Sequence, residues 1–167
     1  VPRPDPYRPL FTRPDGSIWA TGLNNLSVDA ISAATAESDK DGLLRGITVN
    51  GIFYAMGTRT IEPWQDIGAE PFPLSRMNTV IQVGLAGPFA VAGVQGEWDN
   101  PAFFVASDGT VRSLSGLATE KVSTPDVEHL IARSDPSSLV ASIYVQEGIP
   151  FWTLSSAEAI GCAAMNR

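Results

Sequence analysis

Apolar and polar residues alternate along much of the chain, and the clearest example predicts a β-hairpin followed by a third strand. Two apolar runs, Ile47–Val49 and Ile52–Met56, are separated by Asn50-Gly51. Asn-Gly between alternating apolar residues indicates a type I′ turn, because both central residues of that turn need a positive φ. We expect the chain to return as a third strand over Arg59–Glu62 and to end it at Pro63, since proline cannot donate into a central ladder.

Aromatic strands of this kind recur three times, at intervals of about fifty residues, the period of a kelch-type propeller blade. They are Ile52–Met56, Ala102–Ala106 and Ile149–Thr153, and each follows another apolar strand. Blades bury their faces only against neighbouring blades. The repeat therefore predicts an all-β, mainly antiparallel fold, a partial β-propeller of about three blade-like meanders with the remaining blades missing or supplied elsewhere. The alternative is a β-sandwich in which the spacing is coincidental.

The rest of the sequence divides into a proline-rich arm and the remainder of the domain. Residues 1–16 carry five prolines, which predicts an extended arm. Residues 17–167 form the predicted propeller-like domain, which we expect to be a fragment of a larger protein. Ser27–Ala36, rich in Ala and small polar residues, fits a helical turn or a loop. Further strands are predicted at Ser17–Thr21, Asn78–Gly84, Phe89–Val94, Val111–Leu114 and Leu139–Gln146.

One helix is predicted, over Thr124–Arg133, and we interpret it as an insertion between blades. Ser123 or Thr124 can cap its first turn, and Pro125 suits the first helical position. The residues at helical spacing, which we expect to form its packing face, are Val127, Leu130 and Ile131.

Composition narrows the classes of function. The chain has 167 residues, 44% of them hydrophobic and 17% charged, which suffices for a core in one domain. The net charge of −7 argues against phosphate-backbone binding as the main function, because nucleic-acid binders need a basic face. No apolar run approaches the roughly 18 residues that span a bilayer. The single cysteine, Cys162, excludes an internal disulfide and fits a small buried apolar residue.

The sequence predicts no catalytic, cofactor-binding or metal-ligating residues. His129 is the only histidine and lies in the predicted helix without ligands at metal spacing, so we interpret it as structural or solvent-facing. Glu62 is placed to pair with Arg59 and is a lone carboxylate. The other acidic residues considered fit turns, caps or surface connections and lack the calcium-loop pattern: Asp39, Asp41, Asp99, Asp108 and Asp126. We therefore expect a protein that is not an enzyme and needs no cofactor.

A series of short motifs in a fixed order resembles a known family. The motifs are Ala34–Asp41, Gly57–Trp64, Phe72–Arg76, Gly84–Pro88, Val122–Glu128 and Tyr144–Leu154. Together they resemble the tail hub proteins of short-tailed, podovirus-type phages, also called packaged-DNA stabilisation or tail nozzle proteins. The resemblance covers residues 34–155. Ile149 stands where members usually have His.

The resemblance implies a structural role in the virion. Such proteins have a propeller-like β fold and form a homo-oligomeric ring, usually a hexamer, below the portal and adaptor proteins. There they close the DNA exit channel, with lumen contact to packaged DNA, and carry the tail needle or other tail proteins. The resemblance also implies assembly in the cytoplasm of the bacterial host and no membrane among the partners.

Two readings of the surface remain open. For a tail hub protein, the expected contacts are the arm Val1–Pro14 and the loops Gln65–Met77 and Gly96–Pro101. The alternative function is a carbohydrate- or receptor-binding β module of a virion or cell-surface protein. That module would use exposed aromatic side chains such as Trp64 and Trp98.

Overall fold

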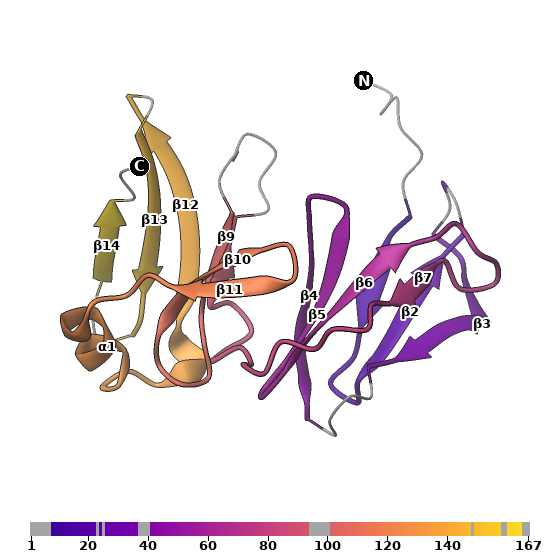
Figure 1. The fold of residues 1–167 in the computed structure, drawn as a ribbon, viewed down its shortest axis with the longest axis horizontal. Helices are drawn as coiled ribbons and strands as arrows, with labels where there is room; N and C mark the ends of the chain where they lie inside the picture. Colours follow the sequence, from indigo (N-terminus) through magenta and orange to yellow (C-terminus); the bar gives the residue numbers. More distant parts are fainter. Residues whose placement is uncertain are drawn as a thin grey trace.

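The computed structural model describes residues 8–22, 24, 26–36, 41–93, 101–147, 149–157 and 160–164. These residues form four antiparallel sheets that follow one another along the chain. Figure 1 shows the sheets side by side, with the N-terminal pair on the right and the C-terminal pair on the left. Each sheet is a meander in which consecutive strands pair, so every sheet is built from one local stretch of sequence.

The first sheet contains β1 (Leu10–Thr12), β2 (Ser17–Thr21) and β3 (Val28–Thr35). The second sheet contains β4 (Leu43–Val49), β5 (Ile52–Gly57), β6 (Ile61–Asp66) and β7 (Leu74–Arg76). The third sheet contains β8 (Val91–Ala92), β9 (Ala102–Val105), β10 (Val111–Ser115) and β11 (Ala118–Lys121). The helix α1 (Pro125–Ile131) and the 3₁₀ turn η1 (Pro136–Ser138) follow. The fourth sheet contains β12 (Val140–Gln146), β13 (Ile149–Ser155) and β14 (Ile160–Ala164).

The predicted repeat is confirmed. Its three aromatic strands are β5, β9 and β13, and each is the second strand of its sheet. The structure adds a meander that the repeat did not include, because β2 with Trp19 holds the same place in the first sheet. No sheet closes on itself among the described residues, as expected for a partial propeller.

The hairpin between β4 and β5 is the one predicted from Asn50-Gly51. Asn50 and Gly51 have φ values of 50° and 78°, and Val49 pairs with Ile52 directly before and after them. The third strand differs from the prediction, because β6 continues through Pro63 to Asp66. The carbonyl of Pro63 accepts from the Met77 amide, 3.0 Å away, just beyond the end of β7. The proline nitrogen, which has no hydrogen to donate, faces the same side as this carbonyl. Its missing hydrogen bond therefore falls beyond the end of β7 and interrupts no pairing within that strand.

The segment Ser27–Ala36 was expected to be a helical turn or a loop, and this was wrong: β3 occupies Val28–Thr35. Its Ala-rich sequence has little strand preference of its own, but pairing with β2 overrides that preference. The predicted arm also contributes to the fold. Leu10–Thr12 within it forms β1, the edge strand of the first sheet, and residues 1–7 lie outside the described part.

The predicted strand Asn78–Gly84 is a crossing segment between the second and third sheets. Among the described residues, its strand pairing with the second sheet is limited to the isolated bridge between Ile81 and Ile61. The predicted helix is shorter than expected, ending at Ile131. Val127 and Ile131, four residues apart, pack on the core, whereas Leu130 is 52% exposed. The packing face is therefore narrower than predicted, because a helix of seven residues turns only one stripe to the core.

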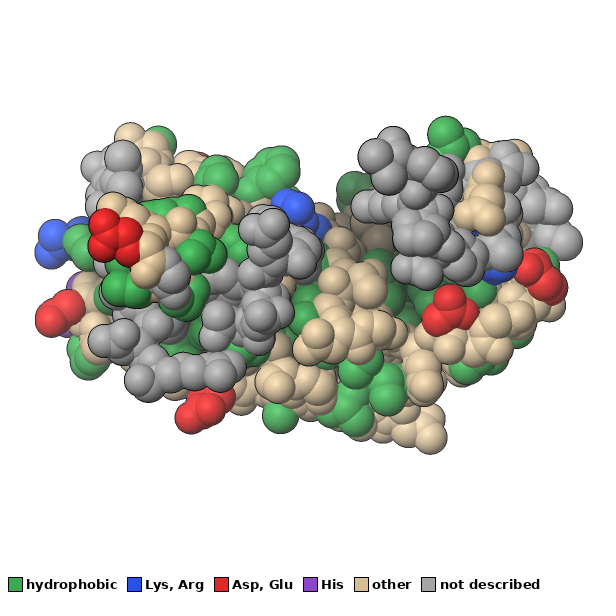
Figure 2. All heavy atoms as spheres, turned by 90° about the horizontal axis from the view of Figure 1, so that it is seen from above, with side chains coloured by type: hydrophobic (Ala, Val, Ile, Leu, Met, Phe, Trp, Pro, Cys, Tyr) green, Lys and Arg blue, Asp and Glu red, His purple; other side chains and the backbone are tan. Residues whose placement is uncertain are grey.

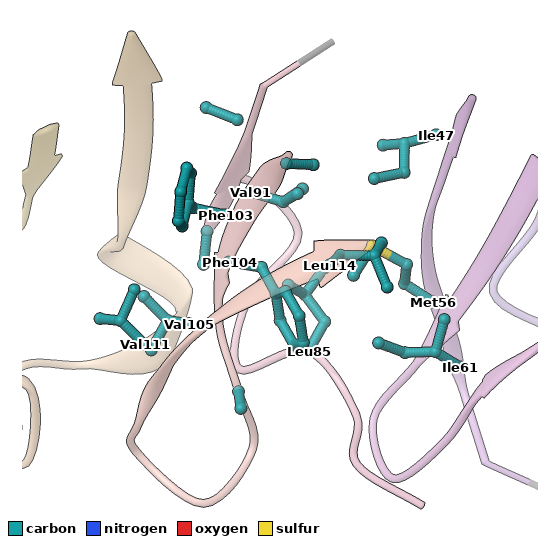
Figure 3. Packing of buried hydrophobic residues seen from close by; sticks show 14 of the residues in the cluster. Ile47, Met56, Ile61, Leu85, Val91, Phe103, Phe104, Val105, Val111 and Leu114 are labelled. Atoms are coloured by element: carbon teal, nitrogen blue, oxygen red, sulfur yellow. The ribbon is translucent and has the colours of Figure 1, made fainter. Parts of the chain in front are cut away.

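Two apolar clusters hold the sheets together, and the second sheet belongs to both. The smaller cluster joins one face of the second sheet to the first sheet through Ile18, Phe53 and Trp64. The larger cluster joins the other face to the third and fourth sheets. Figure 3 shows Met56 and Ile61 of the second sheet pointing toward Leu85, Phe104 and Leu114. The internal sheets are thus apolar on both faces, as a stack of blades requires.

Candidate functional site

Two of the family-like motifs, Gly57–Trp64 and Gly84–Pro88, meet at the junction between the second and third sheets. The amide of Leu85, in the crossing segment, donates to the carbonyl of Gly57 at 2.8 Å. Ile61 and Ile81 exchange two backbone hydrogen bonds of 3.0 Å. Gly84 lies so close to the backbone of Thr58 that a Cβ there would overlap it. Two motifs far apart in sequence are therefore fixed to each other by backbone contacts.

Asp41 fixes the turn at this junction. Its carboxylate accepts hydrogen bonds from the amides of Arg59 at 2.6 Å and Thr60 at 2.8 Å. A Cβ at Gly57 would lie 2.5 Å from the same carboxylate. Sequence reasoning placed Asp41 in a surface connection. Nothing local in the sequence signals its role, because the turn that it binds lies 18 and 19 residues further along.

Glu62 lies beside this turn and is 3% exposed. The Nη1 atom of Arg76 lies 3.8 Å from Oε2 of Glu62, with the two residues on the neighbouring strands β6 and β7. Asp41 and Glu62 both line a pocket with about 10 Å³ open to the centre of a water molecule, room for about one water.

Tyr54 forms a polar link across the second and third sheets. It is 1% exposed, and its hydroxyl donates to the carbonyl of Gly116 at 2.8 Å, in the turn between β10 and β11. Burial raises the pKa of Tyr54 above 10.0. The neutral, donating form is therefore the form that suits this site.

The other candidate residues have structural surroundings. His129 is exposed in the last turn of α1. The Asp108 carboxylate accepts from the amide and hydroxyl of Thr110 and from Arg112, which fixes the turn between β9 and β10. Among the described residues no group of three or more His, Cys, Asp or Glu side chains could hold a metal ion. The side chain of Cys162, in β14, lies outside the described set, as do Asp39 and Asp99.

Glu128 in α1 anchors the helix to the third sheet. Its carboxylate accepts from Lys121 at 2.6 Å and from the Ser123 hydroxyl at 2.7 Å. The hydrogen bond from Lys121 is the main reason why the pKa of Glu128 lies below 4.5, and the hydrogen bond from Ser123 is the second. Ser123 also accepts from the amide of Val111 at 3.1 Å. The motif around this helix thus binds α1 to its neighbouring sheet.

The predicted contact loop Gln65–Met77 is partly held against the first sheet. Arg8 pairs with Glu70 at 3.0 Å, and the Ser32 hydroxyl donates to the carbonyl of Pro71 at 2.7 Å. The alternative binding module needed Trp64 to be exposed, but Trp64 is 5% exposed and packs edge-on against Phe72. Trp64 is buried because it lies on the face of β6 that packs in the smaller apolar cluster. Trp98 and most of the loop Gly96–Pro101 lie outside the described part of the chain.

Sequence reasoning missed two further surfaces, the exposed apolar faces of the first and fourth sheets. Tyr144 and Phe151 stack at 5.1 Å on the fourth sheet, and Tyr144 is 44% exposed. Phe11 and Trp19 pair on the first sheet, and Phe11 is 49% exposed. The strand alternation at these positions was the available signal, but exposure depends on which sheets have a neighbour.

Comparison with known proteins agrees with this picture of a scaffold. A family model described as "Bacteriophage P22 Gp10, beta-propeller" matches residues 8–151. The match extends over parts of all four sheets and includes the junction. No curated protein matches the chain. Within the described residues, no helix is long and apolar enough to cross a membrane.

Proposed function

Because the chain belongs to the phage family described as "Bacteriophage P22 Gp10, beta-propeller", we propose that it is a tail hub protein that joins the portal and adaptor ring to the distal tail. In this role it closes the DNA exit channel and so stabilises the packaged DNA. Membership of the family makes the chain a bacteriophage structural protein and a component of the virion. The proposal adds its place in the tail, a homo-oligomeric ring such as a hexamer, contact with the tail needle or other tail proteins, and assembly in the host cytoplasm.

The observation that carries the proposal is that residues of the family-like motifs hold neighbouring sheets together. Asp41, Gly57 and Gly84 fix one sheet to the next, and the pocket that Asp41 and Glu62 line has room for about one water. Such an arrangement supports a rigid part that works through its surfaces, without catalysis. The second reading, a carbohydrate- or receptor-binding module, loses one of the two aromatic residues that it named, because Trp64 is buried.

The net charge limits how the channel is closed. A charge of −7 opposes a strong, salt-dependent grip on the phosphate backbone. We therefore propose that contact with packaged DNA in the lumen is a steric block by the assembled ring.

Interrupting the gene in the phage that encodes it tests the proposal. Heads should still package DNA but should lose it afterwards, so nuclease-protected DNA per particle should fall at least tenfold. A matched phage carrying His129→Ala, a change at an exposed helical residue, should keep its DNA. Particles that lack the protein and retain their DNA would contradict the proposed role.

A further inference from the structure

The turn between β4 and β5 carries the one Asn-Gly pair of the sequence, Asn50-Gly51. Both residues are exposed, and a Cβ placed on Gly51 would meet no atom within 4 Å. Figure 1 shows the tip of this hairpin at the upper side of the molecule. Figure 2 views the molecule from that side, where uncharged surface fills most of the middle. Water therefore reaches the turn, and a new charge there would change a largely uncharged surface.

An asparagine that precedes glycine can react with the backbone that follows it. The amide nitrogen of Gly51 attacks the side-chain carbonyl carbon of Asn50, and a new C–N bond closes a five-membered succinimide ring. The bond from that carbon to the side-chain nitrogen breaks, and the nitrogen leaves as ammonia with the proton of the Gly51 amide. Water then opens the ring at either carbonyl carbon, which leaves aspartate or isoaspartate. No oxidant or reductant takes part.

We propose that Asn50 is a modification site of the folded protein, where spontaneous deamidation through this succinimide produces aspartate and isoaspartate. The inference stands on the chemistry and exposure of the turn and does not depend on the proposed place in the tail. The chain is a component of a virion, whose copies are not renewed after assembly. The modified form therefore accumulates with the age of the particle.

The glycine directs the reaction to this position. Gly51 has no Cβ beside its amide, so the attacking nitrogen is unshielded. Asn78 is followed by Thr79, whose branched side chain crowds the nitrogen that would attack. Asp108 also precedes a glycine, but its carboxylate already accepts hydrogen bonds. An ionised carboxylate is also a poor target for a nucleophile, whereas the side-chain amide of Asn50 is neutral.

The folded turn sets the rate of the reaction. Asn50 has a φ of 50°, in the left-handed region, and this backbone holds its side-chain carbonyl carbon away from the Gly51 nitrogen. The ring therefore closes only while the turn is open. Opening disturbs only the end of the hairpin, where Val49 pairs with Ile52. Local opening of this kind costs less free energy than unfolding of the whole chain.

Isoaspartate is the product that damages the hairpin. Its main chain runs through the former side-chain carbons, so the turn gains one backbone atom. A type I′ turn of two residues depends on its fixed length and on two positive φ values, and the pairing of Val49 with Ile52 follows directly from it. The two strands reach both apolar clusters, the larger through Val49 and the smaller through Phe53. Loss of this turn therefore weakens the sheet that joins both halves of the fold.

Incubation of the whole folded chain at mildly alkaline pH, followed by trypsin digestion and mass spectrometry, tests the proposal. Cleavage after Arg45 and Arg59 releases the peptide 46–59, in which Asn50 is the only side-chain amide. We expect its mass to rise by about one dalton, the difference between an amino and a hydroxyl group, with uptake of oxygen from labelled water. Isoaspartyl methyltransferase should label the same peptide. The conversion should be at least tenfold faster than at Asn78.

The same chain unfolded in urea gives the rate at Asn50 without the turn. The folded chain should react more slowly than the unfolded chain, in proportion to how rarely the turn opens. A folded chain that keeps Asn50 intact while the unfolded chain converts completely would overturn the proposal, because the turn would then block the reaction. Equal conversion at Asn50 and Asn78 in the folded chain would also overturn it, because Gly51 would then have no part in it.

Asn50→Asp separates the effects of the two products. Aspartate tolerates the left-handed region as asparagine does, so the freshly purified variant should unfold at the same urea concentration as fresh wild type. The isoaspartate form, separated from aged wild type by ion exchange, should unfold at a lower urea concentration than Asn50→Asp. Equal stability of these two forms would overturn the assigned damage to the hairpin.

Discussion

Gly84 is a residue at which the crossing segment lies directly against the backbone of the second sheet. Its own backbone lies against Thr58 and Arg59 of the turn after β5. Its carbonyl accepts from the amide of Ser107 at 2.9 Å, in the third sheet. The neighbouring Leu85 amide donates to Gly57 at 2.8 Å. A single residue without a side chain thus lets the crossing segment touch both sheets.

Gly84→Ala should be strongly destabilising. The new Cβ would overlap the backbone of Thr58 and Arg59, and backbone cannot move aside as a side chain can. We expect a loss of about 2 to 4 kcal/mol in the free energy of unfolding, measured by urea denaturation.

Gly42→Ala is the matched control for this change. The nearest atom to a Cβ at Gly42 is the carbonyl oxygen of Pro14 at 3.9 Å, an ordinary contact. Its effect should stay within about 1 kcal/mol. Equal losses in the two variants would show that close approach at Gly84 is not the cause.

The hairpin is the element that repeats through this fold, and its turns are fixed by short polar residues. Asn50-Gly51 joins β4 to β5 with positive φ at both positions. In the third sheet, Asp108 fixes the turn from β9 to β10 through its bonds to Thr110 and Arg112. Local chemistry thus sets the register of these pairs through contacts made within one sheet.

Asp108→Asn should make the stability of the third sheet less dependent on pH. Burial acts to raise the pKa of Asp108, but the hydrogen bonds from Thr110 and Arg112 outweigh it, so the pKa lies below 3.8. The charged form therefore stabilises the folded state above the unfolded-state pKa. That contribution is lost as the pH falls through the lower folded-state pKa. Since the carboxylate is partly exposed, we expect at most about 1 kcal/mol.

Urea denaturation at neutral pH and at about pH 2 measures this difference. The wild type should be more stable than Asp108→Asn at neutral pH, and the two should converge in acid. A difference that persists unchanged in acid would assign the effect to the shape of the side chain and not to its charge.

The elements predicted correctly from the sequence are those whose signals are local. The Asn50-Gly51 turn, the β9–β10 turn at Asp108 and the aromatic strands all depend on neighbouring residues. The errors are elements decided by pairing. The strand β3 forms because β2 lies beside it, and β6 tolerates Pro63 because β7 ends there.

The same limit applies to the site. The motifs that carry the resemblance were found in the sequence, but their function in the fold was not. Asp41 acts on amides that only the folded chain brings near it. The burial of Trp64 depends on Phe72 and the first sheet. Long-range contacts of this kind leave no periodic trace in a single sequence.

At the scale of the whole molecule, the sheets are coupled in series. Among the described residues, the apolar contacts of the first sheet with the core belong to the smaller cluster, which includes Ile18. The second to fourth sheets share the larger cluster, which includes Phe104 and Trp152. Stacked repeats of this kind are stabilised mainly by their nearest neighbours. A substitution that destabilises the first sheet should therefore have little effect on the stability of the third and fourth sheets.

Hydrogen exchange on two core variants checks this coupling. Ile18→Ala removes a fully buried side chain between the first two sheets, at a cost of about 2 to 5 kcal/mol. Amides of β1, β2 and β3 should then exchange at least about thirtyfold faster, with little change in β9 and β10. Phe104→Ala opens the larger cluster and should speed exchange in the second, third and fourth sheets together. Uniform acceleration by Ile18→Ala would instead show that the four sheets open as one unit.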